Sequence, residues 1–382
     1  MDPRAFTRRS PGELVPIPGG HAFVPGPLPS AIDLPGATVR LLSEAERAIG
    51  HLNGMTAATR SAELLLFAIG RREAVESSRI EGTEASFADV ARQQVTQDVA
   101  NDDVQDVLSY LSAMGYAQQR LGEIPLCLNL IREAHGVLLP DGRGRNRAPG
   151  EFRRVQVYVE GDSPSNATYV PPPPDRLVRC LDDWEKHLHT DELPLLVHGA
   201  ILHYQFEAIH PFLDGNGRIG RLVNLLYLLV HDVLDQPYLD LSAYFEAYRS
   251  SYYRLLNQVS QKGDWTDWIA FYLRGVATQA RMAADDCAAA LELRDRYVER
   301  LDAGRANATT RRLLDMLFDN PFATIPEMAR RLNVTFPTVS NAIKQLVAMG
   351  VLQEVTGKRK NREYMASEIL DIFTNPPADR RE

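Results

Sequence analysis

Twelve consecutive residues between two predicted helices carry the side chains with the clearest capacity for chemistry. They read His210, Pro211, Phe212, Leu213, Asp214, Gly215, Asn216, Gly217, Arg218, Ile219, Gly220 and Arg221. Pro211 disfavours a helical conformation at His210, so the preceding helix should end there and leave the imidazole at the entrance of a loop. Gly215 and Gly217 allow a positive φ and a close approach of the backbone to a ligand. The pattern predicts a binding loop.

The charged residues of this loop indicate phosphate chemistry. The next helix begins just after the glycines, so its free backbone N–H groups and its dipole point into the loop. Arg218 and Arg221 lie on one face of the first helical turn, where two cations are unfavourable unless a polyanion sits between them. Asp214 is well placed to hold a divalent metal that bridges phosphate oxygens. His210 remains as a titratable group, poised near neutral pH to accept a proton from a hydroxyl.

The elements that must position this loop follow from the hydrophobic pattern. Apolar residues recur at helical spacing between Ala37 and Tyr116. The loop itself is flanked by expected helices at 195–209 and 222–234, and the second is apolar nearly all round and therefore buried. Further helices are expected at 126–139, 175–190, 242–259 and 264–300.

The loop matches without a gap the Fic signature H-P-F-x-D-G-N-G-R-x-x-R, and the chain resembles the Fic family over roughly residues 20–285. The arm at 23–29, the helix at 41–49 and the segment at 73–86 resemble the helical region that often precedes Fic cores. The resemblance implies a mainly α fold with a protruding β-hairpin flap. It also implies an enzyme that moves AMP from ATP to a Ser, Thr or Tyr hydroxyl of a target protein or of itself, releases diphosphate and requires Mg²⁺.

The resemblance assigns roles by motif position. His210 corresponds to the general base and Asp214 to the Mg²⁺ ligand. The nucleotide-binding residues correspond to Gly215, Asn216 and Gly217 as an anion nest, to Arg218 and Arg221 on the β- and γ-phosphates, and to Ile219 and Gly220 between them.

A second segment, from Ser77 to Gly82, has two interpretations. Gly82 is a plausible C-terminal cap and Glu81 a surface acid in the last helical turn. An acid at that end opposes the helix dipole, however, and invites a cationic partner. The segment resembles the family's inhibitory motif [ST]-x-x-x-E-[GN], with Ser77 and Glu81 in its positions. The resemblance implies that Glu81 pairs with Arg221 and that ATP then binds askew.

Three further features concern substrate contacts. Alternation from Val155 to Val159, a turn, and a return strand ending at Val170 predict a hairpin. It corresponds in position to the family's flap, which would pair with a target chain as an added strand, although a decorative hairpin is the alternative. Tyr253 could stack on adenine or belong to the core, and Gln205 could touch the nucleotide. His198 and His203 are five apart, not four as a helix-borne metal pair requires, and are interpreted as structural.

Residues 305–382 differ in charge from the rest of the chain. Their formal net charge is about +3, whereas the net charge of the remaining residues is about −11. Expected helices at 309–318, 325–332 and 336–349, followed by a hairpin, resemble bacterial winged-helix DNA-binding domains. The residues that could meet DNA are Thr338, Ser340, Asn341 and Lys344 in a major groove, and Lys358, Arg359 and Lys360 on phosphates. Winged helices also bind proteins, so residues 305–375 could bind either DNA or a protein partner.

Composition limits the class of protein. The 382 residues, 45% hydrophobic and 24% charged with a net charge of −8, fit a soluble chain of two or three domains. No stretch is apolar enough for a membrane span, and no secretory signal follows the N-terminal arginines. Cysteines are few and widely separated, which favours a reducing cytosol. The expected domains are a Pro/Gly-rich arm without regular structure (1–35), an N-terminal helical region (36–120), the catalytic core (121–304), a winged helix (305–375) and a tail (376–382).

Three functional hypotheses remain open at this stage. The leading one is an autoinhibited, ATP- and Mg²⁺-dependent protein adenylyltransferase. The second is a hydrolase that removes AMP with the same site, in which Glu81 orients water. The third is a DNA-binding regulator that senses a nucleotide. We also expect a homodimer, a cytoplasmic location and no membrane association.

Overall fold

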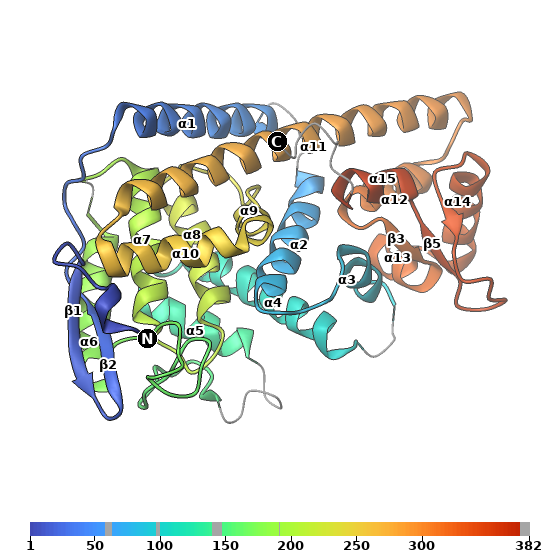
Figure 1. Cartoon of the computed structure of the whole chain (residues 1–382). Coiled ribbons are helices and arrows are strands. Elements are labelled where there is room, and N and C mark those ends of the chain that lie inside the picture. Colours follow the sequence, from blue (N-terminus) through green and yellow to red (C-terminus); the bar gives the residue numbers. More distant parts are fainter. Residues whose placement is uncertain (58–62, 97–99, 140–146, 191, 375–382) are drawn as a thin grey trace.

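The computed structural model describes residues 1–57, 63–96, 100–139, 147–190 and 192–374 (Figure 1). The fold is mainly helical, as predicted, with a helical body and a smaller C-terminal domain. The helix α11 (Trp265–Ala303) runs along the body and reaches the C-terminal domain. The predicted tail at 376–382 lies outside the described residues.

The body is built from helices on either side of the signature loop. The N-terminal region contains α1 (Gly36–Ala57), α2 (Glu63–Ile80), α3 (Phe87–Gln93) and α4 (Asp102–Leu121). The body continues with α5 (Leu128–Leu138), α6 (Pro174–Leu188), α7 (Leu195–Ile209), α8 (Asn216–Val230), α9 (Leu241–Ala247) and α10 (Arg249–Lys262). Helix α7 has the bounds expected from the sequence, whereas α8 begins at Asn216 and not at Leu222.

Helix α7 lies at the centre of the body. Nearly all of its side chains are buried, as its continuous apolar sequence requires. The indole N–H groups of Trp184 on α6 and Trp268 on α11 donate hydrogen bonds to the carbonyl oxygens of Leu202 and Ala200, at 3.0 and 2.8 Å. These contacts from two neighbouring helices fix α7, and therefore the residue at its C-terminal end.

The N-terminal arm differs from the prediction. Residues expected to lack regular structure form an antiparallel hairpin of β1 (Gly12–Ile17) and β2 (Gly20–Pro25), preceded by a short 3₁₀ turn at Pro3–Ala5. The prediction failed because proline is tolerated at turns and on the unpaired side of a two-stranded edge. Pro18 and Gly19, with φ 84° at Gly19, form the turn. Phe23 then anchors the hairpin, being fully buried.

The second predicted hairpin, at 155–170, is also different. It contains one isolated bridge, Val159 with Tyr169, and no paired strands. Side-chain donors take the carbonyls that a β-ladder would have used: Gln156 Nε2 bonds to the carbonyl oxygens of Val157 and Pro171, at 3.1 and 2.9 Å. The segment is therefore an irregular loop and not a strand pair.

The C-terminal domain has the predicted winged-helix order of elements. They are α12 (Ala308–Asp319), β3 (Phe322–Thr324), α13 (Ile325–Leu332), α14 (Phe336–Ala348), β4 (Gln353–Glu354), β5 (Glu363–Met365) and α15 (Ser367–Thr374), with sheet order β3-β5-β4. Asn333 closes α13 in the left-handed conformation, with φ 53°. This tight turn sets α14 at an angle to α13, as in a helix-turn-helix.

The C-terminal domain packs against the N-terminal helices α2 and α3. Arg92 on α3 forms a two-pronged ion pair with Glu363 on β5, at 2.5 and 3.1 Å. The Asn320 amide donates a hydrogen bond to the carbonyl oxygen of Ala91 at 2.8 Å, in a buried contact. The winged helix is thus held against the region that carries the predicted inhibitory segment.

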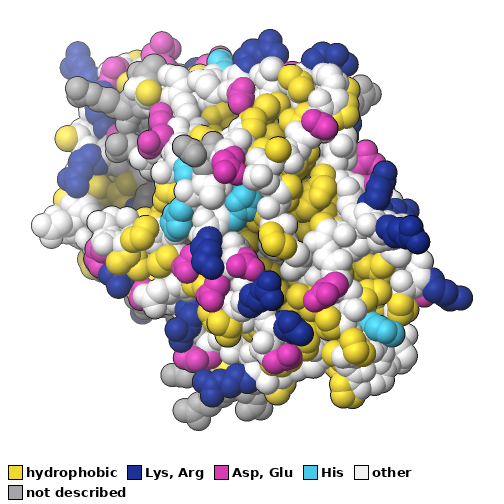
Figure 2. Space-filling view, turned by 90° about the vertical axis from the view of Figure 1, so that its left-hand side faces the viewer, with side chains coloured by type: hydrophobic (Ala, Val, Ile, Leu, Met, Phe, Trp, Pro, Cys, Tyr) yellow, Lys and Arg dark blue, Asp and Glu magenta, His cyan; other side chains and the backbone are white. Residues whose placement is uncertain are grey.

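One side of the molecule has a mixed surface charge. Figure 2 views the side of β1, β2 and α6 and shows Lys and Arg side chains interspersed with Asp and Glu. On α6, Arg179 and Lys186 both pair with Asp183, at 3.9 and 3.7 Å. Interspersed opposite charges give a solvated face and no extended field of one sign. Within the described residues, no helix has the length and apolar character needed to cross a bilayer.

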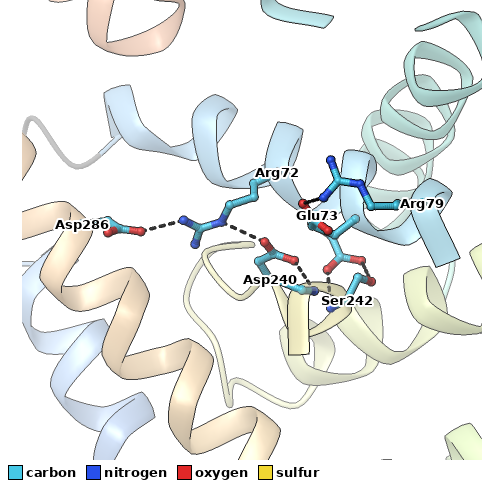
Figure 3. Close-up of polar contacts among 8 residues, drawn as sticks. Arg72, Glu73, Arg79, Asp240, Ser242 and Asp286 are labelled. Carbon is cyan, nitrogen blue, oxygen red and sulfur yellow. Dashed lines mark hydrogen bonds and ion pairs between the residues drawn. The ribbon is translucent and has the colours of Figure 1, made fainter. Parts of the chain in front are cut away.

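Buried polar groups join α2 to the body (Figure 3). The guanidinium of Arg72 lies between Asp240, at the start of α9, and Asp286 on α11, at 2.8 and 2.7 Å. The neighbouring Glu73 carboxylate accepts hydrogen bonds from the backbone N–H and hydroxyl of Ser242, at 3.0 and 2.6 Å. Burial raises the pKa of Glu73 well above its usual value, and the nearby Asp240 adds to the rise.

Replacing Arg72 with methionine should destabilise the fold. The change leaves Asp240 and Asp286 buried without their cation, which costs about 3–5 kcal/mol when one partner of a buried pair is removed. The control is Arg281→Met on α11, because Arg281 pairs with Glu44 between exposed side chains and should contribute less than about 1 kcal/mol. Urea unfolding of both variants measures the difference, and equal losses would contradict the assigned role of Arg72.

Candidate active site

His210 lies immediately after α7 in an unusual backbone conformation. Its φ of 50° and ψ of 64° are left-handed, and its N–H bonds to the Phe206 carbonyl oxygen at 3.0 Å. Pro211 prevents the helix from continuing, as predicted from the sequence. A non-glycine residue with positive φ is uncommon and marks a position held by its surroundings. The half-buried imidazole therefore has a fixed place at the mouth of a cavity.

The loop after His210 is built on its own hydrogen bonds. Asn216 accepts a hydrogen bond from the Phe212 N–H at 2.7 Å and donates one to the Phe212 carbonyl oxygen at 3.0 Å. Gly215, with φ 75°, turns the chain into α8. These bonds begin the helix directly after the loop, so the N–H groups of its first turn face the site.

Gly217 has no room for a side chain. A Cβ atom there would collide with the carboxylate of Glu81 and lie 2.8 Å from a guanidinium nitrogen of Arg221. A larger residue at this position would therefore displace the ends of these two side chains and disturb their pairing.

His135 on α5 packs against the signature loop and bonds to it, and the sequence analysis did not identify this residue. Its Nδ1 accepts a hydrogen bond from the Gly150 N–H at 2.8 Å, so Nε2 carries the proton and donates to the Asp214 carbonyl oxygen at 3.0 Å. The imidazole stacks on Phe212 with ring centroids 3.8 Å apart. Burial lowers the pKa of His135 to about 4, so this support stays neutral.

Arg221 is buried and paired with α2. Its Nε donates to the Ser77 hydroxyl at 2.9 Å, and its Nη2 donates to the Ser77 carbonyl oxygen at 2.7 Å and to Glu81 Oε1 at 2.8 Å. Burial alone would raise the pKa of Glu81, but the charge of Arg221 outweighs it and holds the pKa below the usual value. The structure thus brings Ser77, Glu81 and Arg221 together as the sequence resemblance implied.

Asp214 and Arg218 lie on the other side of the loop. The Asp214 carboxylate contacts Arg147 and lies 3.9 Å from Arg218 Nη2. Arg218 is buried, and its Nε has no hydrogen-bond partner within the described residues. Burial lowers the pKa of Arg218. An unpaired guanidinium N–H in a buried position is suited to an anionic ligand.

A cavity extends from the loop along α7 and α10. Its lining residues are Glu81, Val159, Glu160, Thr168, Tyr169, Tyr204, Glu207, Ala208, His210, Gly217, Arg221, Tyr253, Leu256, Asn257 and Ser260. The side chains of Glu81 and Arg221 meet at Gly217, and Tyr169, Tyr204, Tyr253 and Leu256 add aromatic and aliphatic surface to the lining. This polarity matches a ligand with an anionic tail and a flat, apolar ring system.

The predicted residues divide into two groups around this cavity. Tyr253 lines it, whereas Tyr252 is buried and bonds through its hydroxyl to His203 at 2.9 Å. Gln205 is not among the lining residues: its amide donates to the carbonyl oxygen of Gly26 at 2.9 Å, because it faces the N-terminal hairpin. Ile219 is buried in the core. Gly220 is packed against Glu207, and these two signature positions shape α8 without lining the cavity.

Several lining residues were missed from the sequence. Tyr204, Leu256, Asn257 and Ser260 reach the cavity from α7 and α10. Tyr204 belongs to α7, which is buried on nearly all sides, and the other three belong to the amphipathic α10, so no local pattern distinguishes them from core residues. His198 is bonded within the core, to the Tyr227 hydroxyl at 2.9 Å.

The imidazole of His210 is neutral at physiological pH. Burial lowers its pKa to about 4, with a further decrease from Arg153, while Glu81 and the Glu207 backbone oppose the decrease. The sequence had suggested a pKa near neutrality. A lower pKa leaves the unprotonated form, which accepts protons, dominant at pH 7.

The activity should therefore persist under mildly acidic conditions. For a base that must be unprotonated, kcat/KM falls as pH drops through the pKa of the free enzyme. With the pKa of His210 at about 4, and not at its ordinary 6.5, kcat/KM for the nucleotide should change little between about pH 7 and pH 5.5. A pH–rate profile checks this, and an acidic limb centred near pH 6.5 would contradict it.

A magnesium ion would find suitable chemistry at Asp214. The carboxylate side chain is 29% exposed at the rim of the loop, next to the N-terminus of α8. In the described part of the chain, no group of three or more His, Cys, Asp or Glu side chains could form a metal cage. Mg²⁺ is commonly held by one or two carboxylates together with substrate phosphates, so a single acid fits that use.

Comparison with known families gives three matches along the chain. Residues 39–119 match the Fic/DOC family N-terminal model, and residues 125–228 match the Fic/DOC family model. Residues 307–353 match a winged helix-turn-helix DNA-binding model. The second match contains the signature loop and α7.

Curated relatives share part of this region. The chain is 31% identical to a protein adenylyltransferase Fic of Drosophila grimshawi over 176 residues, which are 44% of this chain and 33% of that protein. It is 36% identical to a protein of the same description from Drosophila yakuba over 126 residues, 32% of this chain and 24% of that one. The chain therefore spans a third or less of the length of these relatives.

A solved structure resembles most of the chain. The crystal structure of a Fic family protein from Desulfovibrio desulfuricans G20 superposes with a TM-score of 0.56 and 20% identity, covering 88% of this chain and 97% of that one. At this identity the likeness concerns the fold.

Proposed function

We propose that this chain, whose residues 39–119 and 125–228 match Fic/DOC family models, is a protein adenylyltransferase that moves AMP from ATP to a side-chain hydroxyl of a protein. The observation that carries the proposal is the shared cavity of His210 and Arg221, with a glycine at the point of closest approach. A neutral base and a buried cation at one end of a partly apolar cavity suit a nucleoside triphosphate. The curated relatives, named as protein adenylyltransferases, support the same reaction class.

The proposed mechanism depends on positioning and charge. His210 takes the proton from the target hydroxyl, whose oxygen attacks the α-phosphorus of ATP. The bond from the α-phosphorus to the bridging oxygen breaks, and diphosphate leaves. Arg218, Arg221 and the N–H groups at the start of α8 stabilise the charge that develops on that leaving group. Asp214 would hold Mg²⁺, which neutralises phosphate charge when bound.

The proposal includes autoinhibition through Glu81. Arg221 cannot offer its Nη2 to a γ-phosphate while that atom is bonded to Glu81 and Ser77. The Glu81 carboxylate also lines the cavity, so it repels the triphosphate directly. Both effects favour an empty or misaligned nucleotide site.

Delivery of the target would use the loop at 155–170. Val159, Glu160, Thr168 and Tyr169 of this loop line the cavity beside His210. A target chain that runs along the loop would bring its hydroxyl to the imidazole by backbone pairing, as in β-augmentation.

A second candidate reaction is the removal of AMP by the same site. It is favoured by the ionised Glu81 carboxylate, which lines the same cavity as His210 and could orient a water molecule. A pre-adenylylated protein substrate separates the two reactions, since only the hydrolase releases AMP from it without diphosphate. The winged helix suggests a further role in DNA binding, through Lys358, Arg359 and Lys360, which are exposed beyond β4.

Intact-mass spectrometry tests the main proposal. The Glu81→Gly variant is incubated with ATP and Mg²⁺, and a mass increase of one adenylyl group per modified site is expected. The same chain with His210→Ala serves as the control and should stay unmodified. An unmodified Glu81→Gly chain that also fails to label any protein in a lysate with radiolabelled ATP would contradict the proposal.

A further inference from the structure

Arg153 is buried between the C-terminal end of α7 and the irregular loop at 155–170. Its side chain donates hydrogen bonds only to backbone carbonyl oxygens within the described residues: Nε to His210 at 2.8 Å, Nη2 to Ile209 at 3.3 Å and to Pro172 at 2.6 Å, and Nη1 to Val155 at 3.2 Å. Its own N–H donates to the carbonyl oxygen of Pro211 at 2.9 Å. Arg153 therefore contacts the backbone of His210 and both ends of the loop at 155–170.

The sequence around His210 creates a need for such a donor. The last carbonyls of a helix have no partner within the helix, and Pro211 has no N–H with which to satisfy one. A guanidinium is planar and carries donors in fixed directions, so it can bond several carbonyls at once. The negative end of the α7 dipole further stabilises a buried cation there.

Arg153 bonds to the backbone carbonyl oxygen of His210 and not to its imidazole. His210 has φ 50°, a conformation that non-glycine residues rarely adopt. Its carbonyl oxygen is held by Arg153 Nε, while its N–H is held by Phe206. With both backbone groups bonded, the backbone of His210 is held in place, and so is the direction in which its Cα–Cβ bond points relative to the cavity.

We propose that Arg153 is a positioning residue for the reaction proposed above: it holds His210 in its left-handed conformation and ties the substrate-facing loop to the same point. This inference depends on the proposed function for its kinetic consequences. The loop is tied because the carbonyls of Val155 and Pro172, at its two ends, are bonded by the same guanidinium.

Electrostatics gives a second, independent consequence. After burial, the charge of Arg153 is the largest influence that lowers the pKa of His210, against the opposing Glu81 and the Glu207 backbone. A change of side chain at 153 should therefore be visible in the titration of His210 even in a chain that transfers nothing.

The test uses two variants, Arg153→Lys and Arg153→Gln, in the full chain with Glu81→Gly. Lysine keeps the charge but not the planar fork, and glutamine keeps two donors but not the charge. The control is Arg132→Lys, because Arg132 also donates to a loop carbonyl, that of Gly150 at 2.8 Å, but contacts no residue of the cavity. Circular dichroism first establishes that each variant is folded.

We expect kcat for transfer to fall about 10- to 10²-fold in Arg153→Lys, with KM for ATP unchanged, because a misplaced base slows chemistry more than binding. Arg132→Lys should keep the parent rate. In Arg153→Gln, NMR titration should show a higher pKa for His210 than in the Glu81→Gly parent, because the charge of Arg153 lowers that pKa. Parent-like kcat in Arg153→Lys together with an unmoved titration in Arg153→Gln would overturn the proposal.

The two proposals fail separately. If the Glu81→Gly parent transfers no AMP, the proposed function fails, and the titration of His210 still decides whether Arg153 controls the imidazole. If the parent is active, Arg153→Lys matches its kcat and the His210 titration in Arg153→Gln does not move, the role of Arg153 fails while the function stands.

Discussion

Replacing His210 with alanine, in a chain that also carries Glu81→Gly, should lower the rate of AMP transfer by about 10²–10⁴-fold, the usual contribution of a general base. The imidazole lines the cavity and is the proposed proton acceptor, and its low pKa keeps it unprotonated at pH 7. ATP binding should change little, because the phosphate contacts proposed above come from Arg218, Arg221 and the start of α8.

Single-turnover labelling measures the transfer rate, and calorimetry measures ATP affinity for the same two proteins. His51→Ala is the matched control, since His51 is an exposed histidine on α1. Transfer at the parent rate in the His210 variant would show that another group acts as the base.

Replacing Glu81 with glycine in the otherwise unchanged chain should raise transfer by about 5- to 150-fold, the range typical of a regulatory coupling. The substitution removes the carboxylate that lies 2.8 Å from Arg221 Nη2, while the Ser77 contacts can still orient the guanidinium. A freed Arg221 can then meet the γ-phosphate.

The gain should be measured as the rate of self-modification and as the affinity for ATP, and we expect both to increase. Glu84→Gly is the control, because Glu84 is an exposed acid three residues further along the chain, in the segment between α2 and α3. Equal activity in the Glu81 and Glu84 variants would mean that the pair with Arg221 does not restrain the site.

Local sequence rules predicted the parts of the site that local chemistry determines. Pro211 located the end of α7, and the glycines located the loop, although α8 begins at Asn216, between the two glycines, and not at the expected Leu222. The contact between Glu81 and Arg221 spans 140 positions of sequence, and it was expected only because the two motifs resemble those of a known family.

Long-range packing explains what the sequence did not reveal. Arg153 and His135 act through backbone carbonyls and N–H groups, which have no signature in side-chain spacing. The pKa of His210 depends mainly on burial, a property of the assembled fold. Gln205 was assigned to the nucleotide because α7 was considered without the N-terminal hairpin that covers that face.

The central claim is geometric, and a crystal structure of the Glu81→Gly chain with α,β-methylene-ATP tests it most directly. We expect the α-phosphorus to lie beside the imidazole of His210. The outer phosphates should lie between the Gly217 backbone, Arg218 and Arg221. A nucleotide bound elsewhere, or an imidazole turned away from the α-phosphorus, would contradict it.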